Sequence, residues 1–309
     1  MRILFHATDA NPAPWLADLQ AVLPQAELRV WQPGDDAAAD YAVVWKPAAA
    51  MLAGRSALKG IFNLGAGVDA ILQLGDALPA GVPVVRLDDA GMGVQMAEYV
   101  CHAVLRHFRK FDLFAAQQAR GEWRFAKPYD KTTFTVGLLG LGVLGSRIAR
   151  SLQALEFPVH GWSRTEKNMA GVTCHSGAAG LDAFLAASRV LVCILPLTVE
   201  TEGILNAALM AKLPRGAYII NVARGAHLVE EDLLAQIASG QIGGATLDVF
   251  RQEPLPPAHP FWQEPRICIT PHIAAVTLRA DSVRQIAAKI TRMEQGQPVE
   301  GVVDRARGY

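Results

Sequence analysis

The chain has 309 residues, of which 51% are hydrophobic and 19% are charged, and its 29 basic residues are balanced by 29 acidic ones. This length allows about two domains of ~150 residues each, and the apolar content excludes an intrinsically disordered chain. The net charge is zero and no basic stripe or tail is present. The composition therefore argues against a nucleic acid or an anionic membrane as the main partner.

Cysteine usage and the first residues indicate the compartment. The 4 cysteines are far apart and form no C-x-x-C pair, which predicts free thiols in a reducing environment. The opening MRILFHATDA holds too short an apolar run for a signal peptide, and no apolar stretch is long enough to span a bilayer. We therefore expect a cytoplasmic protein.

Short apolar runs alternate with helical patterns in the first third of the chain. Such alternation is typical of a parallel sheet that is covered by helices on both faces. The expected strands are 2–5, 28–31, 41–45, 61–64 and 82–87, and the expected helices are 14–23 and 68–74.

A single long helix is expected over 94–120. It is much longer than an average helix, and apolar residues recur in it at near-helical spacing from Val100 to Phe114. A helix of this length often bridges domains or forms a subunit interface, although a plain core helix fits the same pattern.

A second alternating region begins near residue 134. The expected strands are 134–139, 159–162, 190–195, 217–222, 245–250 and 267–270, and the expected helices are 143–155, 181–187, 206–212, 230–239 and 280–294. The sequence thus predicts an α/β protein with two doubly wound parallel-sheet domains and a cleft between them.

The segment 137–150, GLLGLGVLGSRIAR, combines an apolar run, three glycines and a helical pattern. Gly140, Gly142 and Gly145 have the G-x-G-x-x-G spacing of a dinucleotide-binding loop, after a strand and before a helix as the motif requires. In this interpretation the glycines permit the tight turn, the approach of the pyrophosphate and the close packing of the helix, in that order. A purely structural glycine turn is the alternative.

The residues after the next strand indicate which coenzyme binds. NAD-binding domains carry an acid there for the ribose 2′-hydroxyl, whereas this chain reads SRTEK over 163–167. Arg164 can bind a 2′-phosphate, which an acid would repel. The sequence therefore favours NADP(H) over NAD(H), although Glu166 tempers the local field and a surface arginine without a ligand is the alternative.

Ionisable residues follow three separate predicted strands: Arg224, Glu253 and His272. Ligands of an open parallel sheet bind beyond the carboxyl ends of its strands. If the sheet is parallel, these three loops and the glycine loop open on one edge, and we expect the three side chains to converge beside the coenzyme.

The three residue types suit the reduction of a carbonyl. Hydride transfer leaves an alkoxide that must be protonated, and His272 is a candidate general acid because histidine titrates near neutral pH. Glu253 would fix the tautomer and favour the imidazolium, and Arg224 would bind a substrate carboxylate. Taken singly, each residue also fits a structural role. The other histidines show no metal-ligand spacing, so no metal is expected.

The first domain must supply the other wall of the cleft. NLGAGVD, residues 63–69, is a glycine-rich loop after a strand, where successive amides could hold a substrate carboxylate. Trp45 and Lys46 end a neighbouring strand and are expected to line the same pocket. A structural turn is the alternative for the loop.

Several motifs resemble those of one family over nearly the whole chain. GLLGLGVLGSRIA, NVARG, LDVFRQEPLP and ITPHIAA resemble the D-isomer-specific 2-hydroxyacid dehydrogenases, and NLGAGVD, GMGVQMAEY, WSRTEK and VDRARGY resemble their glyoxylate/hydroxypyruvate reductase A branch. The resemblance implies an oxidoreductase that uses NADPH to reduce glyoxylate to glycolate and hydroxypyruvate to D-glycerate. It implies Arg224, Glu253 and His272 as the catalytic residues.

The resemblance also implies a Rossmann coenzyme domain over 98–277 and a discontinuous, flavodoxin-like substrate domain over 1–97 and 278–309. It implies a homodimer built through the coenzyme domain, and Trp123 is a candidate to reach the neighbouring site. The residues expected to bind the coenzyme are Gly140, Gly142, Val143, Leu144, Gly145, Ser163, Arg164, Thr165, Lys167, Leu195, Pro196, Val222, Ala223, Asp248 and His272. Those expected to bind the substrate are Trp45, Leu64, Gly65, Ala66, Gly67, Arg224 and His272.

Two other functions remain open at this point. One is the reduction of a different 2-oxo acid on the same scaffold. The other is a nucleotide-sensing binding protein that has lost turnover, although the presence of all three candidate catalytic residues argues against it.

Overall fold

The structure is a computed structural model that describes residues 1–8 and 10–309. The chain divides into two compact units, one formed by Met1–Met92 with Thr277–Tyr309 and the other by Gly93–Val276. The predicted domain boundaries, after residues 97 and 277, stay predictions beside this division. The roles of the two units and the cleft between them stay predictions.

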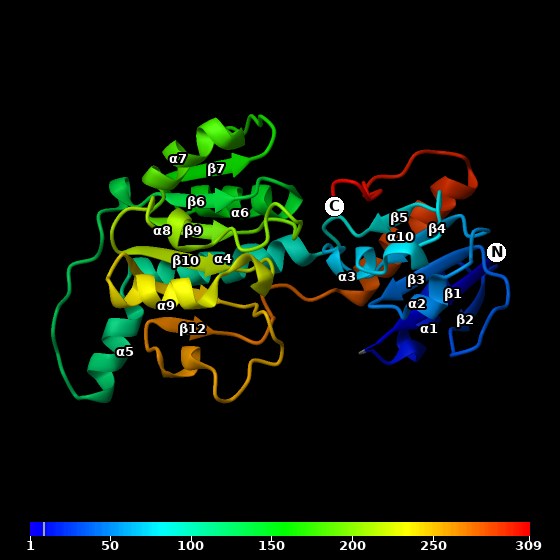
Figure 1. The fold of residues 1–309 in the computed structure, drawn as a ribbon, viewed down its shortest axis with the longest axis horizontal. Coiled ribbons are helices and arrows are strands. Elements are labelled where there is room, and N and C mark those ends of the chain that lie inside the picture. Colours follow the sequence, from blue (N-terminus) through cyan, green and yellow to red (C-terminus); the bar gives the residue numbers. More distant parts are fainter. Residues whose placement is uncertain (9) are drawn as a thin grey trace. The chain divides into compact units, whose positions relative to one another are not determined.

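The first unit contains a five-stranded sheet in the order β2-β1-β3-β4-β5. Every pair of neighbours in it is parallel, and this order is that of flavodoxin-like folds (Figure 1). The strands are β1 (Arg2–Ala7), β2 (Glu27–Val30), β3 (Tyr41–Trp45), β4 (Gly60–Asn63) and β5 (Val84–Arg86). The helices are α1 (Pro12–Val22), α2 (Ala49–Leu52), α3 (Asp69–Leu72), the 3₁₀ turn Gly75–Ala77 and α10 (Arg279–Glu294).

Helices cover both faces of this sheet because side chains alternate along each strand. Leu4 of β1 lies in one buried cluster with Met51 of α2. The next residue, Phe5, points the other way, and its ring lies 6.0 Å from that of Trp15 in α1. Helix α1 packs against α10, so the last helix of the chain completes the core of the first unit.

The C-terminal segment is held against strand β5. Val302 pairs with Val85 in an antiparallel bridge, and the Arg86 N–H donates to the Gly301 carbonyl over 2.9 Å. Lys289 of α10 is buried, and its ammonium lies 2.8 Å from the Asp88 carboxylate. These contacts explain why the last thirty-odd residues belong to the same unit as the first ninety.

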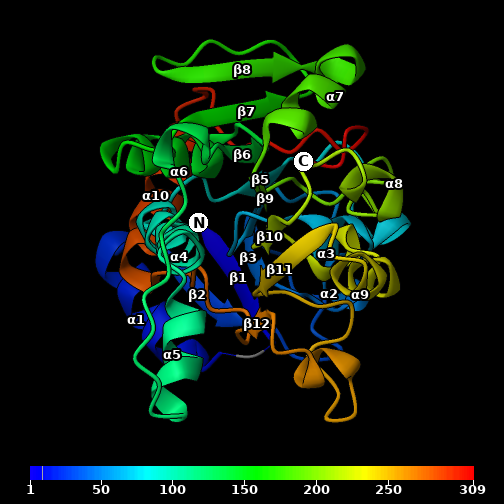
Figure 2. The same ribbon diagram turned by 90° about the vertical axis from the view of Figure 1, so that its left-hand side faces the viewer.

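The second unit contains a seven-stranded sheet in the order β12-β11-β10-β9-β6-β7-β8. All neighbours are parallel, and Figure 2 shows the strands in sequence from β8 at the top to β12 at the bottom. The first six strands have the order of the Rossmann fold, to which β12 adds a seventh. The two predicted parallel sheets are therefore confirmed.

The strands of this sheet are β6 (Val136–Leu139), β7 (Val159–Ser163), β8 (Val172–Ser176), β9 (Val190–Cys193), β10 (Ala217–Asn221), β11 (Ile242–Leu247) and β12 (Ile267–Ile269). The helices are α4 (Met92–Phe108), α5 (Phe111–Ala119), α6 (Val143–Ala154), α7 (Gly177–Ala187), α8 (Ala207–Met210) and α9 (Glu230–Ala238), with 3₁₀ turns at Lys131–Thr133, Gly225–His227 and Pro260–Gln263. Leu138 packs with Ile148 of α6 on one face, and Leu139 packs with Phe184 of α7 on the other.

The prediction of one helix over 94–120 is wrong. Helix α4 ends at Phe108 and α5 begins at Phe111, because Lys110 adopts a left-handed conformation with φ +57°. Glycine usually takes this position at a helix end, so the sequence carries no signal for the break. After this break the apolar residues are no longer all buried, since Phe111 at the start of α5 is 54% exposed.

The prediction also missed strand β8, which is only partly buried and so lacks a clear apolar run. Strand β11 is Ile242–Leu247 rather than 245–250, because the chain leaves the sheet after Leu247 and turns toward the site. Helix α7 begins at Gly177, four residues before the predicted start at 181. The other predicted strands agree with the structure to within two residues at each end.

Among the helices of the described residues, none is long and apolar enough to cross a membrane.

Candidate active site

The carboxyl edge of the seven-stranded sheet carries the four predicted loops. Gly140 follows β6, Arg224 follows β10, Glu253 follows β11 and His272 follows β12. Because β9 lies between β6 and β10 and all these strands are parallel, the four loops leave the sheet on the same side. The parallel arrangement on which their convergence depends is therefore present.

His272 and Glu253 are in direct contact. The His272 Nδ1 lies 2.8 Å from Oε2 of Glu253, and Oε1 of the same carboxylate accepts the Phe250 N–H over 2.9 Å. Partial burial acts to raise the pKa of Glu253, but the hydrogen bonds from His272 and Phe250 and the charges of His272 and Arg224 outweigh it, and the pKa lies below its usual value. Glu253 is therefore ionised at neutral pH and accepts hydrogen bonds only.

This contact assigns the tautomer of His272. An ionised carboxylate cannot donate, so Nδ1 must carry the proton that lies between the two groups. The other ring nitrogen, Nε2, is left to exchange a proton with a ligand. The side chains are 45% and 37% exposed, which leaves the pair accessible from solvent.

Arg224 is set by the loop that follows β10. The amide of buried Asn221 donates to the Arg224 carbonyl over 3.0 Å and accepts the Ala223 N–H over 3.2 Å. The Arg224 N–H donates to Nδ1 of His227 over 3.2 Å. This His227 is fully buried and its Nε2 lies 3.3 Å from the Pro196 carbonyl, a role that its sequence context did not indicate.

Gly225 lets the loops after β10 and β11 lie against each other. A Cβ atom at this position would lie 1.8 Å from the Phe250 carbonyl carbon and 2.3 Å from the Arg251 nitrogen. Only glycine avoids this clash with backbone atoms. Since the Phe250 N–H also holds Glu253, a side chain at residue 225 would displace backbone beside the acid, and sequence reasoning had not singled out this glycine.

The glycine loop shows which of its members the fold itself requires. Gly140 has φ +121°, and a Cβ atom there would lie 2.9 Å from the Ile194 carbonyl oxygen. A Cβ atom on Gly145 would lie 2.1 Å from the Gly140 oxygen. Both positions therefore need glycine for packing within the chain itself.

Gly142 differs from these two glycines. An added Cβ atom would meet no atom within 4 Å, and the φ of −76° is open to any residue. Helix α6 begins at the next residue, Val143, which is 48% exposed. Open space in front of the free amides of a helix N-terminus fits a pyrophosphate.

The end of β7 offers polar groups to the adenosine end of a coenzyme. Ser163 is the last residue of the strand, and its hydroxyl donates to the Thr165 carbonyl over 2.7 Å, which shapes the turn that carries Arg164. The positive charge of Arg164 also acts on Glu200, whose pKa is lowered mainly by a hydrogen bond with Thr198. Arg164 thus follows the strand directly, close to the position where NAD-binding domains carry an acid.

Other residues expected to bind the coenzyme lie at the same edge. Leu195 and Pro196 follow β9, and Val222 and Ala223 follow β10 and are buried. Asp248, which follows β11, is 1% exposed, and its carboxylate accepts hydrogen bonds from residues 270, 273 and 274. Their contacts with a coenzyme stay predictions.

The predicted substrate loop lies in the first unit, after strand β4. The Asn63 amide donates to the carbonyls of Gly65 and Gly67, over 3.1 and 2.9 Å, and so holds the loop in a tight curve. The Trp45 ring packs directly on Gly65, where a Cβ atom would lie 2.5 Å from Cζ3. In the described part of the chain, the N–H groups of residues 65–67 donate no hydrogen bond. Such a loop suits a carboxylate.

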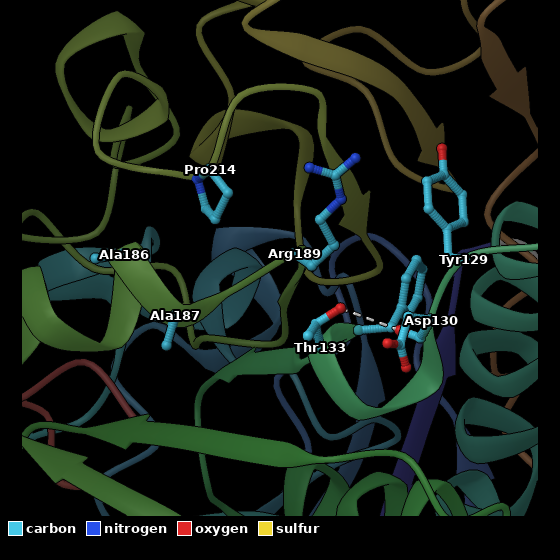
Figure 3. A pocket seen from close by; sticks show the side chains of 8 residues that line it. Tyr129, Asp130, Thr133, Ala186, Ala187, Arg189 and Pro214 are labelled. Carbon is cyan, nitrogen blue, oxygen red and sulfur yellow. Dashed lines mark hydrogen bonds between the residues drawn. The ribbon is translucent and has the colours of Figure 1, made fainter.

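A cavity of about 330 Å³ lies at the opposite edge of the seven-stranded sheet. Its lining includes Phe134 before β6, Arg189 before β9 and Pro214 before β10. Figure 3 shows Arg189 and Pro214 beside the opening. Ligands of such sheets bind at the carboxyl edge, so this cavity does not belong to the candidate site. Among the described residues, no group of three or more His, Cys, Asp or Glu side chains could hold a metal ion.

Comparison with known proteins identifies similar sequences. The family model described as D-isomer specific 2-hydroxyacid dehydrogenase, NAD binding domain, matches residues 101–274. A curated relative, glyoxylate/hydroxypyruvate reductase A of Serratia proteamaculans (strain 568), is 53% identical over 313 residues, which covers 100% of both chains.

Two solved structures are also similar over the whole chain. A D-isomer specific 2-hydroxyacid dehydrogenase from Xanthobacter autotrophicus Py2, in complex with NADPH and MES, is 42% identical with a TM-score of 0.94 and covers 100% of this chain and 99% of that one. An NADPH-dependent glyoxylate/hydroxypyruvate reductase from Sinorhizobium meliloti, in complex with NADP and sulfate, is 40% identical with a TM-score of 0.93 and the same coverage.

Substitution by alanine should have different effects at the two kinds of glycine in the loop. Gly142→Ala should change the free energy of unfolding by less than ~1 kcal/mol, but it should weaken binding of a nicotinamide dinucleotide by about tenfold or more, or about 1.4 kcal/mol. Gly145→Ala should cost about 1–3 kcal/mol of stability through overpacking. Urea unfolding and a fluorescence titration measure the two effects. Unchanged affinity in Gly142→Ala would contradict the phosphate position.

Proposed function

The chain belongs to the D-isomer-specific 2-hydroxyacid dehydrogenase family, and from this premise we propose that it reduces small 2-oxo acids, glyoxylate to glycolate and hydroxypyruvate to D-glycerate, with NADPH. The observation that carries the proposal is the contact of His272 with Glu253 at the sheet edge that also holds Arg224 and the glycine loop. The similarity to the glyoxylate/hydroxypyruvate reductase A of Serratia proteamaculans, and to two solved structures in complex with NADPH or NADP, supports it.

The residues present fit a nicotinamide dinucleotide. When bound, this group supplies the hydride that reduces the carbonyl. The open space at Gly142 and the N-terminus of α6 receive the pyrophosphate. Ser163, Arg164, Thr165 and Lys167 receive the 2′-phosphate, which explains a preference for NADPH over NADH.

His272 supplies the proton that the reaction needs. The oxygen of the former carbonyl gains negative charge, and Nε2 of the imidazolium donates a proton to it. Glu253 keeps the other proton on Nδ1 and offsets the positive charge of the ring. The lowered pKa of Glu253 keeps this partner ionised throughout the neutral range.

Arg224 and the loop in the first unit bind the substrate. The guanidinium can hold the carboxylate and polarise the adjacent carbonyl, which orients the acceptor carbon for hydride transfer. The N–H groups of Gly65, Ala66 and Gly67 take the rest of the carboxylate, beside Leu64 and under the Trp45 ring. The first unit thus serves as the substrate domain and the second as the coenzyme domain.

The chain also forms a homodimer through the second unit. Trp123 and Phe125, which follow α5, are 101% and 87% exposed, and they line a groove of about 620 Å³ with residues of that helix. Large aromatic side chains exposed in this way are typical of a protein interface. In the dimer, Trp123 reaches toward the neighbouring active site.

The reaction takes place in the cytoplasm. All four cysteines are free thiols, and one of them, Cys193, is fully buried in the sheet. Free thiols without a disulfide framework are typical of proteins in reducing compartments.

Oxidation of NADPH, followed by its absorbance, tests the activity directly. Glyoxylate and hydroxypyruvate should be reduced with a higher kcat/KM than pyruvate, and KM for NADPH should be about tenfold or more below KM for NADH, because one phosphate–arginine interaction contributes at least ~1.4 kcal/mol. Equal constants for the two coenzymes would contradict the role of Arg164. No oxidation with any of the three acids would contradict the function itself.

Changes at the acid–base pair should alter turnover. His272→Ala should lower kcat by at least ~10²-fold, the lower end of general acid catalysis. Glu253→Gln should also lower kcat throughout the neutral range, where the lowered pKa of Glu253 keeps the unmodified carboxylate ionised, because an amide carries no charge to offset that of the ring. Glu264→Gln, which removes a carboxylate paired with Arg266 outside the site, should leave kcat unchanged. The assignment fails if both glutamate variants behave alike.

The dimer is tested by sedimentation of the unmodified chain and of Trp123→Asp. The unmodified chain should sediment at twice its own mass. The variant should dissociate into monomers at a higher protein concentration, since a buried charge at an interface costs several kcal/mol. Val22→Asp, at a 42% exposed position on α1, is the control and should not change the mass. A monomeric unmodified chain would exclude this assembly.

A further inference from the structure

A chain of hydrogen bonds runs from helix α4 to the loop that carries His272. The Tyr99 hydroxyl lies 2.5 Å from Oγ1 of Thr270, and the Thr270 hydroxyl donates to Oδ1 of Asp248 over 2.6 Å. The Asp248 carboxylate also accepts the N–H groups of Ile273 and Ala274, each over 2.8 Å. All of these residues belong to the second unit.

The number of protons determines the direction of this chain. Thr270 has one hydroxyl proton and gives it to Asp248, so its oxygen can only accept from Tyr99. Burial, together with the charge of Asp248, raises the pKa of Tyr99, which therefore keeps its proton as a donor. Tyr99 thus fixes the rotamer in which Thr270 points at the carboxylate.

Asp248 in turn holds the segment around His272 on both sides. Its backbone carbonyl accepts the His272 N–H over 2.8 Å, and its carboxylate accepts hydrogen bonds from residues 270, 273 and 274. Between them, His272 has φ +56°, a left-handed conformation that is costly for a residue other than glycine. The surrounding hydrogen bonds keep it in this conformation and so direct the ring to Glu253.

We propose that Tyr99 is a positioning residue for His272, which it orients through Thr270 and Asp248. The inference rests on the proposed function, because it concerns the general acid of that reaction. Tyr99 itself does not touch the reacting atoms. Its hydroxyl removes the rotational freedom of Thr270, and the loss of that hydroxyl loosens the segment on which the imidazole stands.

The chain contains a matched control. Tyr218 of β10 also pairs its hydroxyl with a threonine, Thr246 of β11, over 2.9 Å, and both of these side chains are buried. This second pair ends in the core of the same sheet and has no hydrogen bond to the His272 loop among the described residues. Tyr99→Phe and Tyr218→Phe therefore remove the same group from the same kind of partner.

The test compares the steady-state kinetics of the two variants. Tyr99→Phe should lower kcat for glyoxylate reduction by about tenfold, less than the ~10²-fold that a misplacement of about 1 Å costs, and should leave KM for NADPH within about twofold of the unmodified protein. Tyr218→Phe should leave kcat unchanged, even if it lowers the midpoint of thermal unfolding as much as Tyr99→Phe does. An unchanged kcat in Tyr99→Phe, or an equal loss in both variants, would overturn the proposal.

A spectroscopic measurement separates this inference from the proposed activity. In protein labelled with ¹⁵N-histidine, the Nδ1–H proton between His272 and Glu253 should give a downfield NMR signal that His272→Ala identifies by its loss. The signal should shift or broaden in Tyr99→Phe and stay in place in Tyr218→Phe. If the unmodified protein reduces no 2-oxo acid, the activity is refuted, and this signal alone decides the positioning role. A signal that is the same in both variants would refute that role.

Discussion

The contact between His272 and Glu253 joins two loops that leave neighbouring parallel strands at one edge of a sheet. β11 and β12 pair in parallel register, so the segments after Leu247 and Ile269 emerge on the same side. The Phe250 N–H holds one carboxylate oxygen and the imidazole holds the other. The tautomer of the ring and the negative charge that acts with Arg224 both depend on this one carboxylate.

Two carboxylates that follow the same strand perform different tasks because their surroundings differ. Asp248 is 1% exposed, and its carboxylate accepts hydrogen bonds from Thr270, Ile273 and Ala274 on both sides of His272, so it orders that segment. Glu253 has a side chain that is 37% exposed and contacts the ring itself, so it can respond to the proton on the imidazole. The buried, fully hydrogen-bonded Asp248 thus positions His272, and the accessible Glu253 takes part in its acid–base chemistry.

Elements with a strong local sequence pattern were predicted correctly, and elements with a weak pattern were not. The strand β6, the glycine loop and the start of α6 at Val143 follow from an apolar run, three glycines and helical periodicity in one short segment. The half-buried strand β8 has no such pattern and was missed. The break at Lys110 was also missed, because a lysine in a left-handed conformation is stabilised by its surroundings, including the Tyr129 ring 4.9 Å from its ammonium, and not by its own preference.

The sequence by itself determined that this protein is an α/β chain with a dinucleotide loop, and that an arginine, an acid and a histidine follow separate strands. Local spacing and strand alternation are enough for that, since parallel strands share an edge. Only the tertiary structure decided that Gly225 must have no side chain beside Phe250, and that Tyr99 reaches Thr270 from a distant helix. These are contacts between residues far apart in the chain, and their existence depends on distances of a few ångströms that no local pattern encodes.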